Sequence, residues 1–190
     1  EPRTARAHRR IRTLSRYIPK TRAMIIVCPL SQVEPLVARH RVSHVVTLLS
    51  PDTGDEPPGG IAPDRHLRLF FHDIALPMEG HTPPTARDAE RLIAFLDSWD
   101  RADPMLIHCW AGISRSTAAA YTALCLFRPQ ADEEALAQEL RAASPSATPN
   151  RLIVSLTDEV LGRQGRMVKA VAGIGRGADA FEGTPFILRP

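Results

Sequence analysis

The residues best suited to covalent chemistry lie in one short stretch, His-Cys-Trp-Ala-Gly-Ile-Ser-Arg-Ser at residues 108–116. Cys109 supplies a sulfur nucleophile, and Arg115 supplies a planar cation that can hold two oxygens of an anion at once. Between them, Gly112 allows a backbone conformation that a Cβ would hinder. These residue types in this order predict a loop, residues 109–115, that holds a tetrahedral oxyanion against a thiolate. We call it the anion loop.

The elements on either side of the anion loop fit that task. The apolar run at 105–107 predicts a buried strand, and 117–127 predicts a helix that is buried because it is apolar nearly all round. A loop that enters a helix N-terminus can turn several unpaired backbone N–H groups toward an anion. The same positive end of the helix favours the thiolate form of Cys109. The sequence therefore predicts both an anion site and an activated nucleophile.

The other residues of the stretch have supporting roles. Ser116 can donate a hydrogen bond to the sulfur, which stabilises the thiolate and later helps it leave. We expect His108 to order the loop through hydrogen bonds, because a thiolate needs no general base. The backbone N–H groups expected to contact the anion are those of Trp110, Ala111, Gly112, Ile113, Ser114 and Arg115.

The remaining chain alternates apolar strand patterns with amphipathic helix patterns. Strands are expected at 24–27, 44–49, 66–71 and 105–107, and helices at 31–39, 85–99, 117–127, 132–142 and 149–162. Ser31 and Asp132 are the expected N-caps of two of these helices. The alternation predicts a single α/β domain, in which helices flank a central, mostly parallel sheet and the anion loop joins the central strand to a helix.

Length and composition predict one soluble globular domain. The chain has 190 residues, of which 44% are hydrophobic and 24% charged. We divide it into a basic N-terminal extension (1–22), a catalytic domain (23–162) and a basic, Gly-rich C-terminal tail (163–190) that packs on the same domain. The extension is interpreted as a solvated arm, with an organelle transit segment or a phosphate-seeking arm as alternatives.

The net charge and the cysteine content disfavour a nucleic-acid-binding protein, a disulfide framework and a zinc site. The net charge of +3 fits an anionic substrate without indicating nucleic acid, and no apolar run is long enough to span a membrane. Three cysteines without a C-x-x-C pair argue against a disulfide framework or a zinc site, so we expect a reducing, cytoplasmic compartment and no metal. Cys28 and Cys125 are expected to be buried thiols. A role for Cys28 as resolving partner of an oxidised Cys109 stays open.

The stretch at 108–116 resembles the signature of the cysteine-based protein tyrosine phosphatases, His-Cys-x5-Arg-Ser/Thr. His108, Cys109, Gly112, Arg115 and Ser116 meet its fixed positions. The compact size and the late loop look most like the small dual-specificity branch, and the resemblance covers roughly residues 24–162. It implies hydrolysis of a phosphoric monoester through a cysteinyl-phosphate intermediate, with no cofactor.

The resemblance also implies two residues outside the loop. The family uses an aspartic acid on a loop after a strand to protonate the leaving oxygen, and Asp73 matches this position. The alternative is an ordinary loop or helix-cap aspartate, with Glu79 and His81 as weaker candidates for the acid. Asn150 matches the family's later Pro-Asn pattern and is expected to brace the loop. A plain helix N-cap is the alternative.

The expected substrate is a phosphorylated protein, through phosphotyrosine, or a small phosphomonoester. The variable loop positions carry no lysine, which weighs against a polyphosphorylated head group. Trp110 either forms part of a pocket wall for an aromatic phosphoester or packs beneath the loop. Two other functions compete, a phosphate-binding pseudophosphatase without turnover and a rhodanese-type sulfurtransferase. The complete set of cysteine, arginine and acid disfavours the first, and the flanking His and Arg-Ser disfavour the second.

Overall fold

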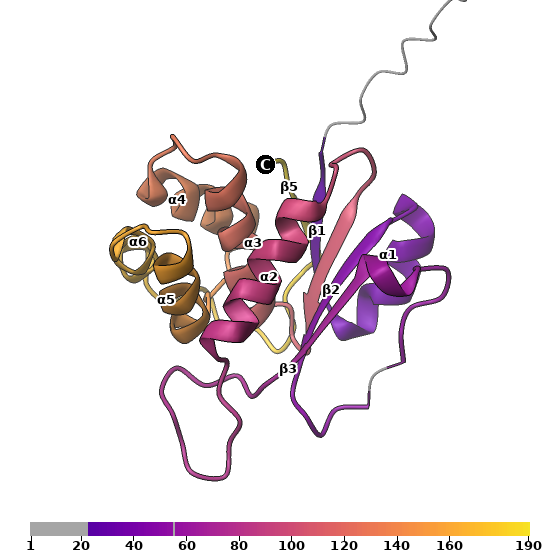
Figure 1. The fold of residues 1–190 in the computed structure, drawn as a ribbon, viewed down its shortest axis with the longest axis horizontal. Helices are drawn as coiled ribbons and strands as arrows, with labels where there is room; N and C mark the ends of the chain where they lie inside the picture. Colours follow the sequence, from indigo (N-terminus) through magenta and orange to yellow (C-terminus); the bar gives the residue numbers. More distant parts are fainter. Residues whose placement is uncertain (1–22, 55) are drawn as a thin grey trace, which may run out of the picture.

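The computed structural model describes residues 23–54 and 56–190. The predicted N-terminal extension, 1–22, lies outside the described residues. Within them a five-stranded sheet has the order β3-β2-β4-β1-β5. One helix, α1, covers one face of the sheet, and the other helices gather on the opposite face (Figure 1). The predicted α/β architecture is confirmed.

The bounds of the elements follow the sequence patterns closely, except in the C-terminal tail. The strands are β1 (Ile25–Pro29), β2 (His44–Leu49), β3 (His66–Phe70), β4 (Met105–Cys109) and β5 (Phe186–Leu188). The helices are α1 (Val33–His40), α2 (Ala86–Ser98), α3 (Arg115–Phe127), α4 (Glu133–Ala143), α5 (Arg151–Val160) and α6 (Arg166–Ile174).

Strand β4, which ends at Cys109, lies at the centre of the sheet. It pairs in parallel with β1 on one side and with β2 on the other, and β2 pairs in parallel with β3. Among the strands of the described residues, only β5 runs antiparallel, against the outer edge of β1. Strands covered on both faces are expected to be apolar throughout, and every residue of β1 and β4 is buried. The end of β4 is therefore a firmly held position for a reactive side chain.

Helix α3 follows the anion loop and is the most enclosed helix of the domain. All of its residues from Arg115 to Cys125 are buried. It lies in the larger core, which also takes side chains from the sheet and from α2, α4, α5 and α6. The smaller core lies between α1 and the other face of the sheet, where Val33 and Val37 pack near Ile26 and Val45.

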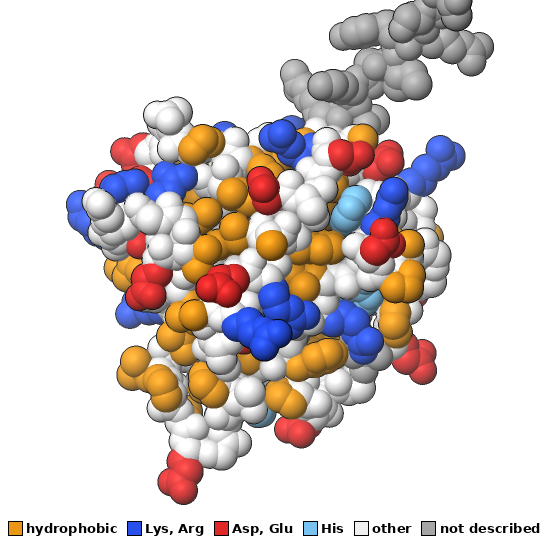
Figure 2. Space-filling model, in the orientation of Figure 1, with side chains coloured by type: hydrophobic (Ala, Val, Ile, Leu, Met, Phe, Trp, Pro, Cys, Tyr) orange, Lys and Arg blue, Asp and Glu red, His pale blue; other side chains and the backbone are white. Residues whose placement is uncertain are grey.

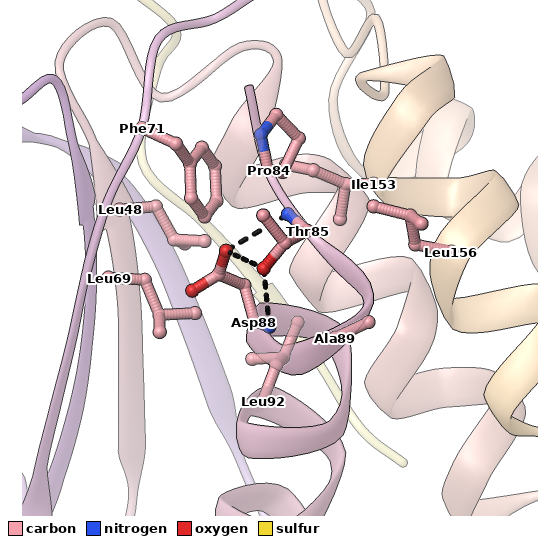
Figure 3. Close-up of a pocket in the computed structure, with 10 residues that line it drawn as sticks. All are labelled: Leu48, Leu69, Phe71, Pro84, Thr85, Asp88, Ala89, Leu92, Ile153 and Leu156. Carbon is pink, nitrogen blue, oxygen red and sulfur yellow. Dashed lines mark hydrogen bonds between the residues drawn. The ribbon is translucent and has the colours of Figure 1, made fainter. Parts of the chain in front are cut away.

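A close-packed seam joins α2 and α5 to the sheet (Figure 3). Leu48, Leu69 and Phe71 face Ala89 and Leu92 of α2 and Ile153 and Leu156 of α5, and a cavity of only about 10 Å³ remains between them. At the edge of the seam, Thr85 and Asp88 form a reciprocal capping box at the start of α2. The seam thus fixes the point at which the loop from β3 rejoins the domain.

One predicted helix cap is confirmed and one is wrong. The Asp132 side chain accepts hydrogen bonds from the backbone N–H groups of Glu134 and Ala135 at the start of α4. Helix α1 begins later than expected, because a short 3-10 turn at Leu30–Gln32 precedes it. Ser31 therefore lies inside this turn and is not the N-cap of α1, a position that Gln32 takes. Its hydroxyl instead donates a hydrogen bond to Glu182 in the tail (3.0 Å).

The C-terminal tail contains two elements that the sequence analysis missed, α6 and β5. Met167, Ala170 and Val171 are buried at helical spacing, but the short run between glycines hides the pattern. The carboxylate of Asp158 fixes the start of α6 by accepting hydrogen bonds from the N–H groups of Gly165 (2.6 Å) and Met167 (2.8 Å). Among the described residues, no helix combines the length and the apolar character needed to span a bilayer.

Candidate active site

The anion loop leaves the end of β4 and lies directly against the end of β1. Gly112 has a φ of +69°, and a Cβ built on it would stand 2.6 Å from the backbone N of Pro29 and 2.8 Å from the carbonyl carbon of Cys28. The N–H of Leu30 donates to the carbonyl of Trp110 (3.1 Å). A residue without a side chain is therefore required at 112, both for the backbone conformation and for this close approach.

Cys109 is almost fully enclosed, with 2% of its surface exposed. Its Sγ accepts a hydrogen bond from the N–H of Gly112 (3.2 Å) and lies 3.1 Å from the hydroxyl of Ser116. Helix α3 begins just after the loop, so its positive N-terminal end lies on the same side. The surroundings of the sulfur are thus arranged to accept negative charge.

Arg115 is buried, and residues that directly follow strands β2 and β3 hold its guanidinium in place. Its Nη1 donates to the carbonyl of Phe71 (3.0 Å) and to the hydroxyl of Ser50 (3.2 Å). Its Nε lies 3.8 Å from a carboxylate oxygen of Asp73. These contacts hold the planar cation in one orientation at the wall of the pocket that Cys109 also lines.

Asp73 lies in the same pocket, on the segment that follows β3. One of its carboxylate oxygens accepts hydrogen bonds from the hydroxyl of Ser114 and from the side-chain amide of Asn150, each at 2.7 Å. The structure therefore brings together Cys109, Arg115 and Asp73. Asp73 is not the cap of a helix, because α2 begins well after it, at Ala86.

Asn150 takes both of the roles that the sequence left as alternatives. Its side-chain oxygen accepts from the N–H groups of Leu152 and Ile153, each at 3.0 Å, and so caps α5. Its amide nitrogen donates to Asp73 and to the carbonyl of Ile74 (3.1 Å). In addition, its backbone N–H donates to the carbonyl of Ser114 (3.2 Å). One side chain thus links α5, the segment after β3 and the anion loop.

His108 lies beneath the loop rather than in the pocket. It is buried, and its Nε2 hydrogen bonds with the hydroxyl of Thr47 (2.7 Å), which also hydrogen bonds with Nε2 of His66 (2.8 Å). Thr47 and His108 are neighbours in the register of β2 and β4. This position matches the expected ordering role of His108. Its link to the two other strands was not visible in the sequence.

The loop after β3 carries the two weaker candidates for the acid, and neither lines the pocket. The ring of His81 packs edge-on against the ring of His72, and its Nδ1 contacts the carbonyl of Glu79. The same loop exposes two large apolar side chains, Leu76 and Met78. Figure 2 shows apolar side chains gathered over this loop, at the lower left of the view.

The pocket itself has a volume of about 430 Å³. Its lining includes the predicted residues Asp73, Cys109, Trp110, Ala111, Ile113, Ser114 and Arg115, together with Ser50, Thr53, Ala180 and Phe181. Trp110 is 53% exposed and borders the pocket, so it does not pack beneath the loop. The sequence gives no local signal for the contribution of Ala180 and Phe181, which come from the far end of the chain.

The two other cysteines are buried, free thiols away from the pocket. Burial raises the pKa of Cys28 to about 12, with a further contribution from the nearby charge of Cys109. Burial likewise raises the pKa of Cys125 to about 12. Cys28 packs in the small core with α1, whereas Cys109 packs in the large core on the other face of the sheet. This arrangement argues against Cys28 as a resolving thiol. Among the described residues, no three His, Cys, Asp or Glu side chains group closely enough to hold a metal ion.

No protein-family model matches this sequence, and no curated protein is detectably similar to it in sequence. Solved structures, in contrast, share its architecture. The match to human DUSP28 covers 74% of this chain and 94% of that chain, with 23% identity and a TM-score of 0.56. The human tyrosine phosphatase-like serine/threonine/tyrosine-interacting protein matches with 20% identity, 74% and 92% coverage and a TM-score of 0.56. PTPMT1, solved in complex with PI(5)P, matches with 19% identity, 78% and 94% coverage and a TM-score of 0.54.

These likenesses concern the order and arrangement of the strands and helices, over nearly the whole length of the matched proteins. They agree with the α/β architecture and the mostly parallel five-stranded sheet of this chain. The chain therefore has the fold of the small dual-specificity phosphatases.

Proposed function

We propose that this protein is a phosphoric monoester hydrolase that acts on phosphotyrosine, or on phosphotyrosine and phosphoserine or phosphothreonine, through a cysteinyl-phosphate intermediate. One observation carries the proposal. Cys109, Arg115 and Asp73 line a single pocket, and the Asp73 carboxylate is tied to the anion loop through Ser114. A nucleophile, an anion clamp and a proton donor are the groups that phosphoryl transfer to sulfur requires.

In the first step the phosphate occupies the anion loop, held by the backbone N–H groups of 110–115 and by Arg115. The Cys109 thiolate attacks phosphorus in line with the leaving oxygen. A sulfur–phosphorus bond forms, the ester phosphorus–oxygen bond breaks, and protonated Asp73 gives its proton to the leaving oxygen. Arg115 and the loop N–H groups stabilise the charge that spreads over the phosphoryl oxygens in the transition state.

In the second step water attacks the cysteinyl-phosphate, and Asp73, now a carboxylate, takes a proton from that water. The sulfur–phosphorus bond breaks, inorganic phosphate leaves, and the sulfur returns to the thiolate. Ser116 supports this step because its hydroxyl, 3.1 Å from Sγ, can donate a hydrogen bond to the departing sulfur. Asn150 and Ser114 hold the Asp73 carboxylate beside the loop through both steps.

The main alternative is a pseudophosphatase that binds phosphate without turnover, and one matched structure is described as phosphatase-like. The presence of all three reactive groups in one pocket supports the enzyme instead. The PI(5)P complex of PTPMT1 raises a lipid phosphate as another substrate class. The lack of lysine in the loop supports a monophosphorylated substrate here.

The test is release of inorganic phosphate from phenyl phosphate and from a phosphotyrosyl peptide, with and without vanadate. We expect vanadate-sensitive release in the wild type and none in Cys109→Ser, which should still bind inorganic phosphate. Asp73→Asn should lower kcat by about 10²-fold or more with little change in KM. Glu79→Gln, on the same loop but outside the pocket, is the matched control and should retain activity. Phosphate binding without release by the wild type would establish the pseudophosphatase instead.

A further inference from the structure

The segment between α6 and β5, residues 175–185, crosses the molecule beside the anion loop (Figure 1, yellow). We call it the C-terminal strap. At one end Arg141 holds it, donating to the carbonyls of Ile174 and Gly175, each at 2.9 Å, and to the carbonyl of Ala147 (2.8 Å). At the other end β5 pairs with β1. The strap is thus fixed at both ends to the scaffold that carries the catalytic residues.

The middle of the strap contacts the anion loop through backbone atoms. The N–H of Gly183 donates to the carbonyl of Ala111 (2.8 Å). A Cβ on Gly183 would stand 2.9 Å from the carbonyl oxygen of Gly112, so a side chain at 183 would force the strap away from the loop. Next to it, Glu182 accepts the hydrogen bond from Ser31. The strap therefore keeps a defined position relative to the anion loop.

This position places Phe181 at the active-site pocket with its side chain almost entirely in water. Phe181 lines the pocket yet is 89% exposed, and Trp110 lines the same pocket and is 53% exposed. Large aromatic side chains gain free energy when they are buried, so two of them left open at one pocket point to a ligand that covers them. The pocket consequently combines an anion-binding loop with an aromatic rim.

The geometry points to Phe181 as a specificity-determining residue, which packs against the aromatic ring of an aryl phosphomonoester whose phosphate lies in the anion loop. This inference rests on the function proposed above and names its substrate class. The ring of a phosphotyrosyl side chain or of a small aryl phosphate projects outward from the phosphate and can be covered by Phe181 and Trp110. Inorganic phosphate and short alkyl phosphates present no such ring.

The strap can tolerate a change at Phe181 without loss of the fold. A hollow of about 390 Å³, lined on the strap side by residues such as Ala180 and Glu182, lies beside the turn at 143–146, which the strap contacts through the Ala178 N–H and the Pro145 carbonyl (2.9 Å). Phe181 itself belongs to neither hydrophobic core. Its replacement therefore removes a contact surface for a ligand and leaves the packing of the domain intact.

The experiment measures binding in the Cys109→Ser background, with phenyl phosphate and inorganic phosphate as probes, by calorimetry. We expect Phe181→Ala to weaken the binding of phenyl phosphate about fivefold and to leave the Kd of inorganic phosphate unchanged within about twofold. Phe181→Tyr should restore phenyl phosphate binding. Val168→Ala, which shortens an exposed apolar side chain on α6 outside the pocket, is the control and should change neither Kd.

A second readout is kcat/KM for phenyl phosphate in the active enzyme, which should fall about fivefold in Phe181→Ala through KM. The inference is overturned if Phe181→Ala leaves the Kd of phenyl phosphate unchanged, or if it weakens the binding of phenyl phosphate and of inorganic phosphate equally. It is also overturned if phenyl phosphate does not bind to the Cys109→Ser protein. The two proposals fail separately. Absence of turnover in the wild type, with the binding difference intact, rejects the hydrolase but keeps the aryl site. If the wild type and Phe181→Ala turn over phenyl phosphate with the same kcat/KM, the hydrolase is kept and the role of Phe181 is rejected.

Discussion

The glycine of the anion loop offers a sharp test of how the fold builds this site. Gly112 combines a positive φ with a close approach to the end of β1. Gly162, just after α5, has nearly the same φ (+64°) but nothing within 4 Å of the position its Cβ would occupy. The pair Gly112→Ala and Gly162→Ala therefore separates the conformational cost of a left-handed alanine from the cost of the steric contact.

The expected magnitudes follow from those two terms. A left-handed alanine costs about 1 kcal/mol, which is the whole effect expected for Gly162→Ala. In Gly112→Ala the new Cβ meets backbone atoms of Cys28 and Pro29, which cannot rotate away, and overpacking of this kind adds about 2 kcal/mol. For a chain of this length these free energies correspond to falls in Tm of about 2–4 °C for Gly162→Ala and about 6–12 °C for Gly112→Ala.

Activity should separate the two variants further. To accommodate the contact, the loop must move away from β1, and with it the N–H of Gly112 that donates to Sγ of Cys109. A displacement of about 1 Å at a reacting centre costs roughly 10²-fold in rate. We therefore expect kcat/KM for phenyl phosphate to fall about 10²-fold in Gly112→Ala and to stay within about twofold of wild type in Gly162→Ala.

Thermal unfolding by circular dichroism and steady-state phosphate release are the two assays, and both variants are measured under the same conditions. Equal falls in Tm for the two variants would show that the contact with β1 does not constrain the loop. A stable Gly112→Ala protein with full activity would refute the reasoning altogether.

Three further predictions concern other parts of the chain. Asn150→Ser keeps a capping oxygen for α5 but removes the amide that donates to Asp73. We therefore expect kcat to fall about tenfold while Tm stays within about 2 °C of wild type. A fall in Tm together with the fall in kcat would contradict a specific role for the Asn150–Asp73 hydrogen bond. Burial raises the pKa of the Cys28 and Cys125 thiols from 9.0 to about 12, so the unfolded chain loses these protons first as the pH rises. The free energy of unfolding should therefore fall between pH 9 and 12, by about 1.4 kcal/mol per pH unit for each thiol, and Cys28→Ala or Cys125→Ala should each flatten that slope in urea titrations. Asp158→Asn should lower the free energy of unfolding by about 2 kcal/mol and speed amide hydrogen exchange at the start of α6, because the amide nitrogen that replaces one carboxylate oxygen cannot accept a backbone N–H. Unchanged exchange there would contradict the role of the Asp158 carboxylate in fixing the start of α6.

The sequence predicted the central part of the fold because its signals there are local. The apolar run before Cys109 and the apolar helix after Arg115 fix a strand, a loop and a helix without reference to the rest of the chain. Asp73 was located only by resemblance to a family. Nothing local distinguishes it from other loop aspartates, and its place beside Arg115 depends on the pairing of β2 with β3 and β4.

The parts that the sequence did not predict depend on contacts between distant segments. Ser31 follows a pattern that suits a helix cap, but its hydroxyl bonds to Glu182, far along the chain. Arg141 holds the strap through backbone carbonyls, which carry no sequence signature. Phe181 lies in a Gly-rich tail that resembles a loop, and only the tertiary structure shows that it reaches the pocket.

The register of β1 has a consequence for folding kinetics. Ile25 lies opposite Met105 on one side and Leu188 on the other, so this edge of the sheet forms only after two very long chain segments have closed. Contacts of such high sequence separation are slow to form, because the entropy of loop closure is lost before any pairing is gained. Since the anion loop lies against the end of β1, we expect its shape to be completed late and partly folded chains to lack the proposed phosphate site. A bound oxyanion therefore stabilises only the native state, and its concentration shifts the balance between folded and unfolded molecules.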